Sequence, residues 1–139
     1  MLYKNELKLK ILSLSENESF ARLAVASFCS CVKIDIETLS DIKTAVSEAV
    51  TNSVVHAYPE TIGEIDINVL IDDNTITITI TDYGIGIEDI EKAKQPFYTS
   101  KPEMERSGMG FTVMEGFMDK VEIISNKNKG TQITLIKNL

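Results

Sequence analysis

A stripe of polar side chains runs along a segment that is otherwise rich in alanine and valine. Glu48, Asn52 and His56 recur every four residues, so on a helix they share one face. A carboxylate and a carboxamide one turn apart suit a divalent cation and the proton of a reacting hydroxyl. Asn52 can bind a cation beside phosphates without adding negative charge, whereas Glu48 can accept a proton. The alternative is a solvated helix face, and for His56 a structural role at the helix end is favoured over catalysis.

Two glycine-containing segments form the rest of the candidate site. Asp82-Tyr83-Gly84-Ile85-Gly86 directly follows an alternating Ile/Thr run, which is typical of a turn or of a backbone kept close to a flat ligand, with Asp82 as acceptor. Ser107-Gly108-Met109-Gly110 precedes a helical pattern, where backbone N–H groups and the helix dipole favour an anion. Lys101 and Arg106 add positive charge nearby. Each segment alone is also explained by an ordinary turn or helix start.

Other phosphate-binding signatures are missing from the sequence. It has no G-x-x-x-x-G-K-[ST] loop, no H-R-D with D-F-G pair of the common protein kinases, and no G-x-G-x-x-G turn. The folds that carry those motifs are therefore disfavoured.

Length and composition predict one ordinary globular domain, residues 1–139. The hydrophobic share is 43%, the charged share is 25%, and the net charge is −7. The negative charge argues against direct nucleic-acid binding, which needs clustered Lys and Arg. No stretch reaches the roughly 20 apolar residues of a membrane span, and the charged start is no signal peptide. Cys29 and Cys31 would point to different faces, so we expect unpaired, mostly buried, inert thiols in a cytoplasmic protein.

The hydrophobic periodicity predicts an α/β protein. We expect a first helix after Ser15, with Glu18 completing a capping box and an apolar stripe that includes Phe20 and Leu23. A second helix should begin near Asp35 and continue to Tyr58, before Pro59. The remaining elements are expected as strands at 7–11, 65–71, 76–80, 121–123 and 133–135, helices at 88–94 and 109–118, and a long loop at 95–108. Each strand has one apolar face, which predicts a two-layer sandwich with helices on one face of the sheet.

Four segments of the sequence, the three above and Gly130–Thr131, together resemble one ATPase superfamily. They stand in the order and spacing of the gyrase, heat-shock chaperone, histidine kinase and mismatch-repair ATPases, and within it the chain is similar to the sporulation anti-sigma-F factors, which are serine protein kinases. The resemblance covers essentially the whole chain. The matching segments are Glu48–Ala57, Asp82–Gly86, Gly108–Gly110 and Gly130–Thr131, with dense matches in Asn17–Arg22, Val46–Asn52, Gln95–Pro96 and Thr99–Phe111.

The resemblance implies a Bergerat-type ATP-binding fold with a mixed, mostly antiparallel sheet, and it assigns roles to individual residues. Asp82 would bind the adenine amino group with Thr131 nearby, Gly84 would lie in the same turn, and Gly86 would leave room for the base. Asn52 would bind Mg²⁺, and Glu48 would deprotonate a serine hydroxyl of a protein substrate. The segment closing over the phosphates would contribute Thr99, Lys101, Arg106, Ser107, Gly108 and Gly110.

The resemblance also implies partners. The family dimerises, binds a sigma factor of the sigma-F type in the ATP-bound state, and phosphorylates an anti-anti-sigma factor. Glu18 and Arg22 match the partner-docking surface, although from the sequence alone a capping residue and an exposed cation are the preferred explanation. Three alternatives remain: an ATP-gated binding module in which Glu48 is structural, a fragment of a sensor histidine kinase, and an anti-sigma kinase of the stress response. The single His56, with no phosphoacceptor helix pair upstream, argues against the second.

Overall fold

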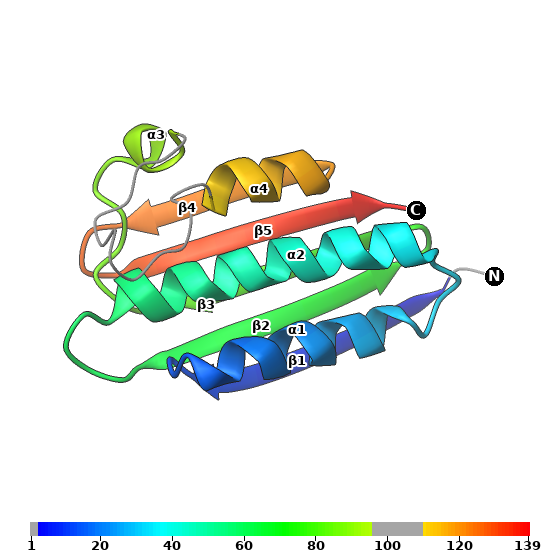
Figure 1. Ribbon diagram of the computed structural model, residues 1–139, viewed down its shortest axis with the longest axis horizontal. Coiled ribbons are helices and arrows are strands. Elements are labelled where there is room, and N and C mark those ends of the chain that lie inside the picture. The colour runs from blue at the N-terminus through cyan, green and yellow to red at the C-terminus, as the bar shows by residue number, and fades with distance from the viewer. Residues whose placement is uncertain (1–2, 96–109) are drawn as a thin grey trace.

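The protein is a two-layer α/β sandwich with all its packed helices on one face of a five-stranded sheet (Figure 1). The computed structural model describes residues 3–95 and 110–139. The elements in chain order are β1 (Lys4–Leu12), α1 (Glu16–Cys29), α2 (Ile36–Asn52), the π-helical turn η1 (Ser53–Ala57), β2 (Glu64–Asp72), β3 (Thr75–Asp82), α3 (Ile90–Ala93), α4 (Gly110–Phe117), β4 (Lys120–Asn126) and β5 (Gly130–Asn138). The predicted two-layer α/β fold class is confirmed, and the sheet that the structure describes is wholly antiparallel rather than mixed.

The sheet has the strand order β1-β2-β3-β5-β4, and each of these neighbouring pairs is antiparallel. Alternation of apolar and polar residues sets the register, because every second residue of a strand faces the helices. The isoleucines of β2 and β3 are buried on that face, while threonines of β3 face the other way. The β3–β5 register places Asp82 opposite Thr131, residues 49 positions apart in sequence.

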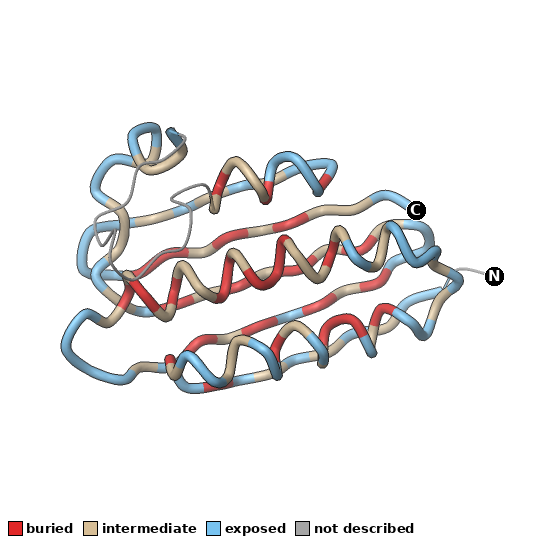
Figure 2. Tube along the Cα trace, in the orientation of Figure 1, coloured by how far each residue is buried: buried red, intermediate tan, exposed pale blue. Residues whose placement is uncertain are grey.

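Helix α2 is the centre of the helical layer, packed between α1 and α4. It begins where the Asp35 carboxylate accepts the Thr38 N–H at 2.7 Å, as an N-cap should. Its buried residues are small or branched, and they lie with the strands beneath in the buried core of the molecule (Figure 2). This packing fixes α2 against the sheet, so side chains on its exposed face have fixed positions.

The first helix differs from its prediction in two ways. Ser15 makes no side-chain cap, so no capping box forms with Glu18. The predicted apolar stripe is also wrong, because Phe20 and Leu23 are 54% and 55% exposed. Helix α1 instead buries small residues and a thiol, namely Ala21, Val25, Ala26 and Cys29. Small side chains let α1 lie close to α2, and that contact decides which face is buried.

The end of the second helix also differs. The predicted α-helix to Tyr58 stops at Asn52 and continues as the single π-helical turn η1, which ends at Ala57. A π turn inserts one extra residue per turn, so it shifts every later side chain around the axis, and such turns are frequent at functional sites. This turn begins directly after Asn52.

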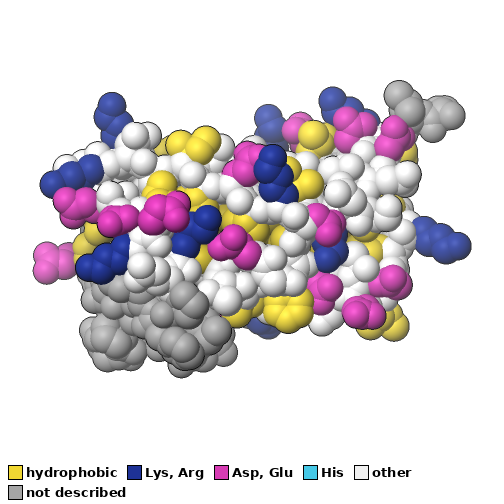
Figure 3. All heavy atoms as spheres, turned by 90° about the horizontal axis from the view of Figure 1, so that it is seen from above, with side chains coloured by type: hydrophobic (Ala, Val, Ile, Leu, Met, Phe, Trp, Pro, Cys, Tyr) yellow, Lys and Arg dark blue, Asp and Glu magenta, His cyan; other side chains and the backbone are white. Residues whose placement is uncertain are grey.

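Three further expectations concern the cysteines, membranes and surface charge. Both cysteines are free, as predicted. Cys29 is buried, and this burial, together with a smaller effect of the neighbouring Cys31, raises the pKa of its thiol to about 12. Cys31 is exposed, so the expectation of a buried thiol is wrong for that residue. Among the described residues, no helix is long and apolar enough to cross a membrane. Charged side chains of both signs are interspersed on the face in Figure 3.

Candidate functional site

The ends of several elements enclose a cavity of about 900 Å³ at one end of the sandwich, the left end in Figure 1. The C-terminal end of α2 with η1, the turn after β3, α3, the first turn of α4 and the β4–β5 turn all contribute to it. The lining residues are Asn52, His56, Ile85–Ala93, Gly110, Phe111, Ser125, Lys127 and Asn128. Three of the segments predicted from sequence to form one site therefore meet here, represented by Asn52, Gly86 and Gly110.

Asp82 ends β3 as a buried carboxylate, only 3% exposed, just behind this lining. Its Oδ1 accepts the backbone N–H groups of Gly84 and Thr131, each at 3.1 Å, and its Oδ2 accepts the Ser53 hydroxyl at 3.0 Å. Burial raises the pKa of Asp82, and these three hydrogen bonds act in the opposite direction. A buried carboxylate held by fixed donors is an acceptor of defined direction.

Glycines are required in the turn after Asp82 because backbone groups approach it closely. A Cβ on Gly84 would lie 2.0 Å from the Ala57 carbonyl oxygen, at the end of η1. Gly86 has a φ of 77°, which favours glycine, and a Cβ there would lie 2.3 Å from the Asn126 carbonyl oxygen. The turn is therefore clamped between the end of the second helix and the β4–β5 turn.

Thr131 connects Asp82 to the cavity wall. A Cβ on the preceding Gly130, which has a φ of 103°, would lie 2.0 Å from the Asp82 carbonyl oxygen, so β5 begins tightly against the end of β3. The Thr131 and Ser125 hydroxyl groups are 2.8 Å apart, and Ser125 lines the cavity. The Ile87 N–H donates to the Ser125 hydroxyl at 2.6 Å, which fixes the chain leaving the turn.

The polar stripe of α2 faces the same region. Asn52 and His56 line the cavity, and Glu48 lies one turn earlier on α2. The Glu48 Oε2 atom is 3.4 Å from the position that a Cβ on Gly110 would occupy, so Glu48 lies against the first residue of α4. A carboxylate thus stands at the edge of the cavity, where α2 meets α4.

The remaining predicted cavity residues, Thr99, Lys101, Arg106, Ser107 and Gly108, lie outside the described residues. The described lining supplies two cations that the sequence had not singled out, Lys92 and Lys127.

The donor set is compatible with magnesium bound together with phosphates. Among the described residues, no group of three or more His, Cys, Asp or Glu side chains could hold a metal by itself. Mg²⁺ usually takes one or two protein oxygens and completes its shell with phosphate oxygens and water. The Asn52 carboxamide in the cavity lining fits that role.

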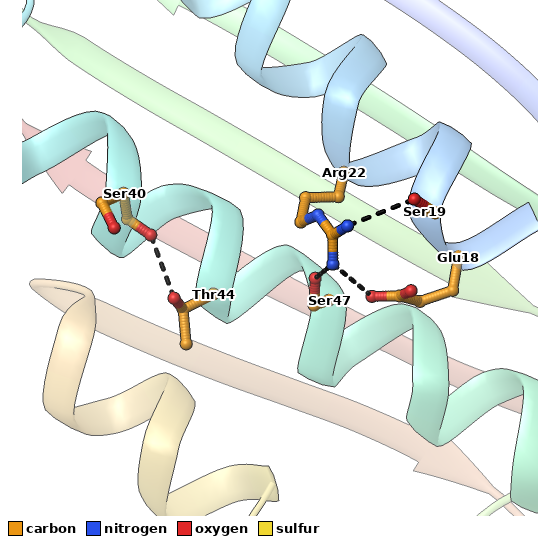
Figure 4. Close-up of polar contacts among 6 residues, drawn as sticks. All are labelled: Glu18, Ser19, Arg22, Ser40, Thr44 and Ser47. Atoms are coloured by element: carbon orange, nitrogen blue, oxygen red, sulfur yellow. Dashed lines mark hydrogen bonds and ion pairs between the residues drawn. The ribbon is translucent and has the colours of Figure 1, made fainter. Parts of the chain in front are cut away.

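Glu18 and Arg22 do not line the cavity, and their side chains extend from α1 toward α2 (Figure 4). Arg22 Nη1 contacts Glu18 Oε1 at 3.3 Å and donates to Ser47 Oγ at 3.3 Å, while Nη2 donates to Ser19 Oγ at 3.2 Å. Ser47 directly precedes Glu48 on α2. The two predicted docking residues therefore form one fixed polar cluster between α1 and the helix that carries Glu48.

Sequence reasoning missed several residues of the site. Ser53 was detectable, since it is a small polar residue directly after Asn52 and before two valines, and it proves to be 1% exposed. Nothing in the sequence marks Tyr58, Ser125 or Lys127, because their positions depend on strand pairing and on the π turn.

Comparison with known proteins places the chain in a class. The sequence pattern of the histidine kinase-like ATPase domain matches residues 12–137. A blue-light activated histidine kinase from Erythrobacter litoralis has a domain of the same fold, with a TM-score of 0.59 and 20% identity over 78% of this chain and 48% of that one. The chain therefore belongs to the histidine kinase-like ATPase family.

Relatives that match over nearly the whole of both chains belong to one group within this family, the anti-sigma F factors. Proteins named anti-sigma F factor are 53% identical in Clostridium acetobutylicum, over 98% of this chain and 95% of that protein, and 55% identical in Caldanaerobacter subterraneus, over 99% and 96%. One from Bacillus velezensis is 53% identical over 98% and 94%. The resemblance inferred from the motifs is confirmed.

Proposed function

We propose that this chain is a Mg²⁺-ATP-dependent protein serine kinase that also binds and inhibits a sigma factor of the sigma-F type, with both activities in one domain. The observation that carries the proposal is the convergence of Asn52, Gly86 and Gly110 on one cavity of about 900 Å³. That volume is within the range of small-molecule and nucleotide sites. The 51–55% identity to proteins named anti-sigma F factor supports the second activity.

Asp82 is the proposed acceptor for the adenine amino group. Its Oδ1 is occupied by two backbone donors, and its Oδ2 has one, from Ser53. Because a carboxylate oxygen accepts more than one hydrogen bond, Oδ2 can take a second donor. Thr131 and Gly84 hold this carboxylate in place, and Gly86 keeps the backbone beside the base free of a side chain.

The phosphates would lie between Asn52 and the first turn of α4. A Mg²⁺ ion bound there would neutralise charge on the phosphate oxygens. The carboxamide of Asn52 would hold the cation without adding charge, and the N-terminus of α4, which begins at Gly110, would favour the anion. We place Thr99, Lys101, Arg106, Ser107 and Gly108 over the phosphates on the strength of the family resemblance alone.

Glu48 is the proposed general base. The serine oxygen of the substrate forms a bond to the γ-phosphorus, ADP leaves, and the hydroxyl proton passes to the Glu48 carboxylate. The position of Glu48 beside Gly110, at the edge of the cavity, supports this role, because the substrate hydroxyl must enter from outside.

Protein partners would dock on α1. The cluster of Glu18 and Arg22 is fixed between α1 and α2, and Phe20 and Leu23 on the same helix are more than half exposed. Exposed large apolar side chains beside a fixed ion pair are typical of a protein-binding surface. We propose that the sigma factor and the anti-anti-sigma factor, the substrate of phosphorylation, use this surface of a homodimer.

Phosphate transfer and sigma binding can be tested separately with purified components. With γ-labelled ATP and the anti-anti-sigma factor, the unmodified protein should label a serine and Glu48→Gln should not. Capture of the sigma factor on immobilised protein should depend on ATP for both variants. ATP-dependent capture without any serine label would establish the ATP-gated binding module instead. Capture that is indifferent to ATP would refute the coupling of the two activities.

A further inference from the structure

Tyr58, the first residue after the π turn, connects two backbone groups at the ends of different strands. Its hydroxyl accepts the Tyr83 N–H at 2.8 Å and donates to the Glu64 carbonyl oxygen at 2.6 Å. Tyr83 follows β3, and Glu64 begins β2, so one phenol oxygen joins the ends of both strands. Loss of the hydroxyl would remove both bonds at once.

The ring of Tyr58 is held as firmly as its hydroxyl. A Cβ on Gly63 would lie 2.2 Å from a ring carbon, so the ring lies flat against the backbone there. Gly63 is itself fixed, because its N–H donates to the Ser13 hydroxyl at 3.0 Å and its carbonyl accepts the Ser13 N–H at 2.9 Å. The hydroxyl therefore has a defined position.

The same end of the helix contacts the next two residues of the turn. The Ile85 N–H donates to the Ala57 carbonyl oxygen at 2.9 Å, and Gly84 packs directly against that carbonyl. Together with Tyr58, this end of the helix holds three consecutive residues, Tyr83 to Ile85. Those residues join Asp82 to Gly86, and their path decides where the Asp82 carboxylate lies relative to the cavity.

We propose that Tyr58 is a positioning residue that sets the base-binding turn, and that recognition of a 6-amino purine depends on its hydroxyl. This inference rests on the proposed function, because it takes Asp82 as the acceptor for the base. Gly84 also donates to Asp82, so a shift at Tyr83 moves both the backbone that carries Asp82 and one of its donors. A phenylalanine at position 58 fills the same space but leaves the turn without its hydroxyl anchor.

The test compares two nucleotides that differ only in the amino group, ATP and purine riboside triphosphate, by direct binding to the full chain. The unmodified protein should prefer ATP by at least about tenfold, the scale of one hydrogen bond to a charged group. Tyr58→Phe should lower ATP affinity by about 3- to 10-fold and change affinity for the analogue by less than about twofold. Tyr3→Phe, a matched loss of one hydroxyl beside the β2–β3 turn, should change neither.

The outcomes separate this inference from the proposed function. If the unmodified protein binds both nucleotides equally, the Asp82 assignment is wrong and the inference falls with it. If the unmodified protein prefers ATP and Tyr58→Phe keeps the full preference, only the inference about Tyr58 is overturned. The same holds if Tyr58→Phe lowers the affinities for ATP and for the analogue equally.

Amide hydrogen exchange gives a second check that needs no variant. The Tyr83 N–H should be protected in the unmodified protein by its bond to Tyr58. Exchange as fast as that of an exposed loop amide would overturn the proposal.

Discussion

The substitution Asp82→Asn separates recognition of the base from stability. Two backbone donors, from Gly84 and Thr131, both point at Oδ1 at 3.1 Å. The asparagine must place its carbonyl oxygen there, because an NH₂ group would face two N–H groups. Its NH₂ group therefore takes the position of Oδ2, beside the Ser53 hydroxyl. A donor then stands where the adenine amino group, also a donor, requires an acceptor.

The expected magnitude follows from the bond that is lost. A hydrogen bond to a charged group contributes about 1.5–3 kcal/mol, so ATP affinity should fall by about 10- to 150-fold. Inosine triphosphate carries an oxygen in place of the amino group and should bind Asp82→Asn better than it binds the unmodified protein. Calorimetric titration of both proteins with both nucleotides measures this exchange of preference. Equal losses for the two nucleotides would refute the proposed direction of Asp82.

The folding stability of Asp82→Asn, relative to that of the unmodified protein, should increase as the pH rises. Burial raises the pKa of Asp82 above its ordinary value of 3.8, so the folded state binds this proton more tightly than the unfolded chain does. The resulting stabilisation is present below pH 3.8 and is lost as pH rises through the folded pKa. Asparagine has no such loss, so its melting temperature relative to the unmodified protein should rise across that window. A pH-independent difference would contradict the assigned pKa direction.

Three further substitutions test other parts of the site, and a thiol-labelling experiment tests the burial of the cysteines. Glu48→Gln should abolish serine phosphorylation while ATP affinity stays within about tenfold, because a lost base affects the chemical step; an equal loss of ATP binding, measured by calorimetry, would make Glu48 structural or a metal ligand. Asn52→Ala should weaken ATP binding in magnesium but change it little in excess chelator, and an unchanged affinity in magnesium would remove the ligand assignment. Gly84→Ala should cost about 2–3 kcal/mol through overpacking, seen as a melting temperature lower by roughly 6–12 °C, and an unchanged melting temperature would show that the helix end is not fixed there. A thiol reagent should label Cys31 quickly and Cys29 only on unfolding, since Cys29 is buried with a pKa of about 12, and rapid double labelling of the folded protein would contradict this.

Much of the fold was predictable because alternation and helical periodicity are local. The isoleucines of β2 and β3 and the N-cap at Asp35 are where the sequence places them. The buried face of α1 was not predictable, since Phe20 and Leu23 are the more hydrophobic residues yet the close approach to α2 selects small ones. Hydrophobicity alone does not report how closely two helices pack.

The site was predictable as a set of segments but not as a set of contacts. The order of Glu48, Asn52, Asp82 and Gly86 was enough to expect one site, and the ends of their elements do meet. The bond between Ser53 and Asp82 joins residues 29 apart, and the π turn that begins at Ser53 is revealed by no hydrophobic pattern. Strand order, which places β5 beside β3, was likewise beyond local patterns.

The most direct test of the central claim is a titration of the unmodified protein with Mg²⁺-ATP, followed by amide NMR shifts. We expect saturable shifts concentrated at one end of the sandwich, in Asn52–Ala57, Gly84–Ala93, Gly110–Phe111 and Ser125–Thr131. Shifts confined to the open face of the sheet, or no saturable change at millimolar ATP, would contradict it.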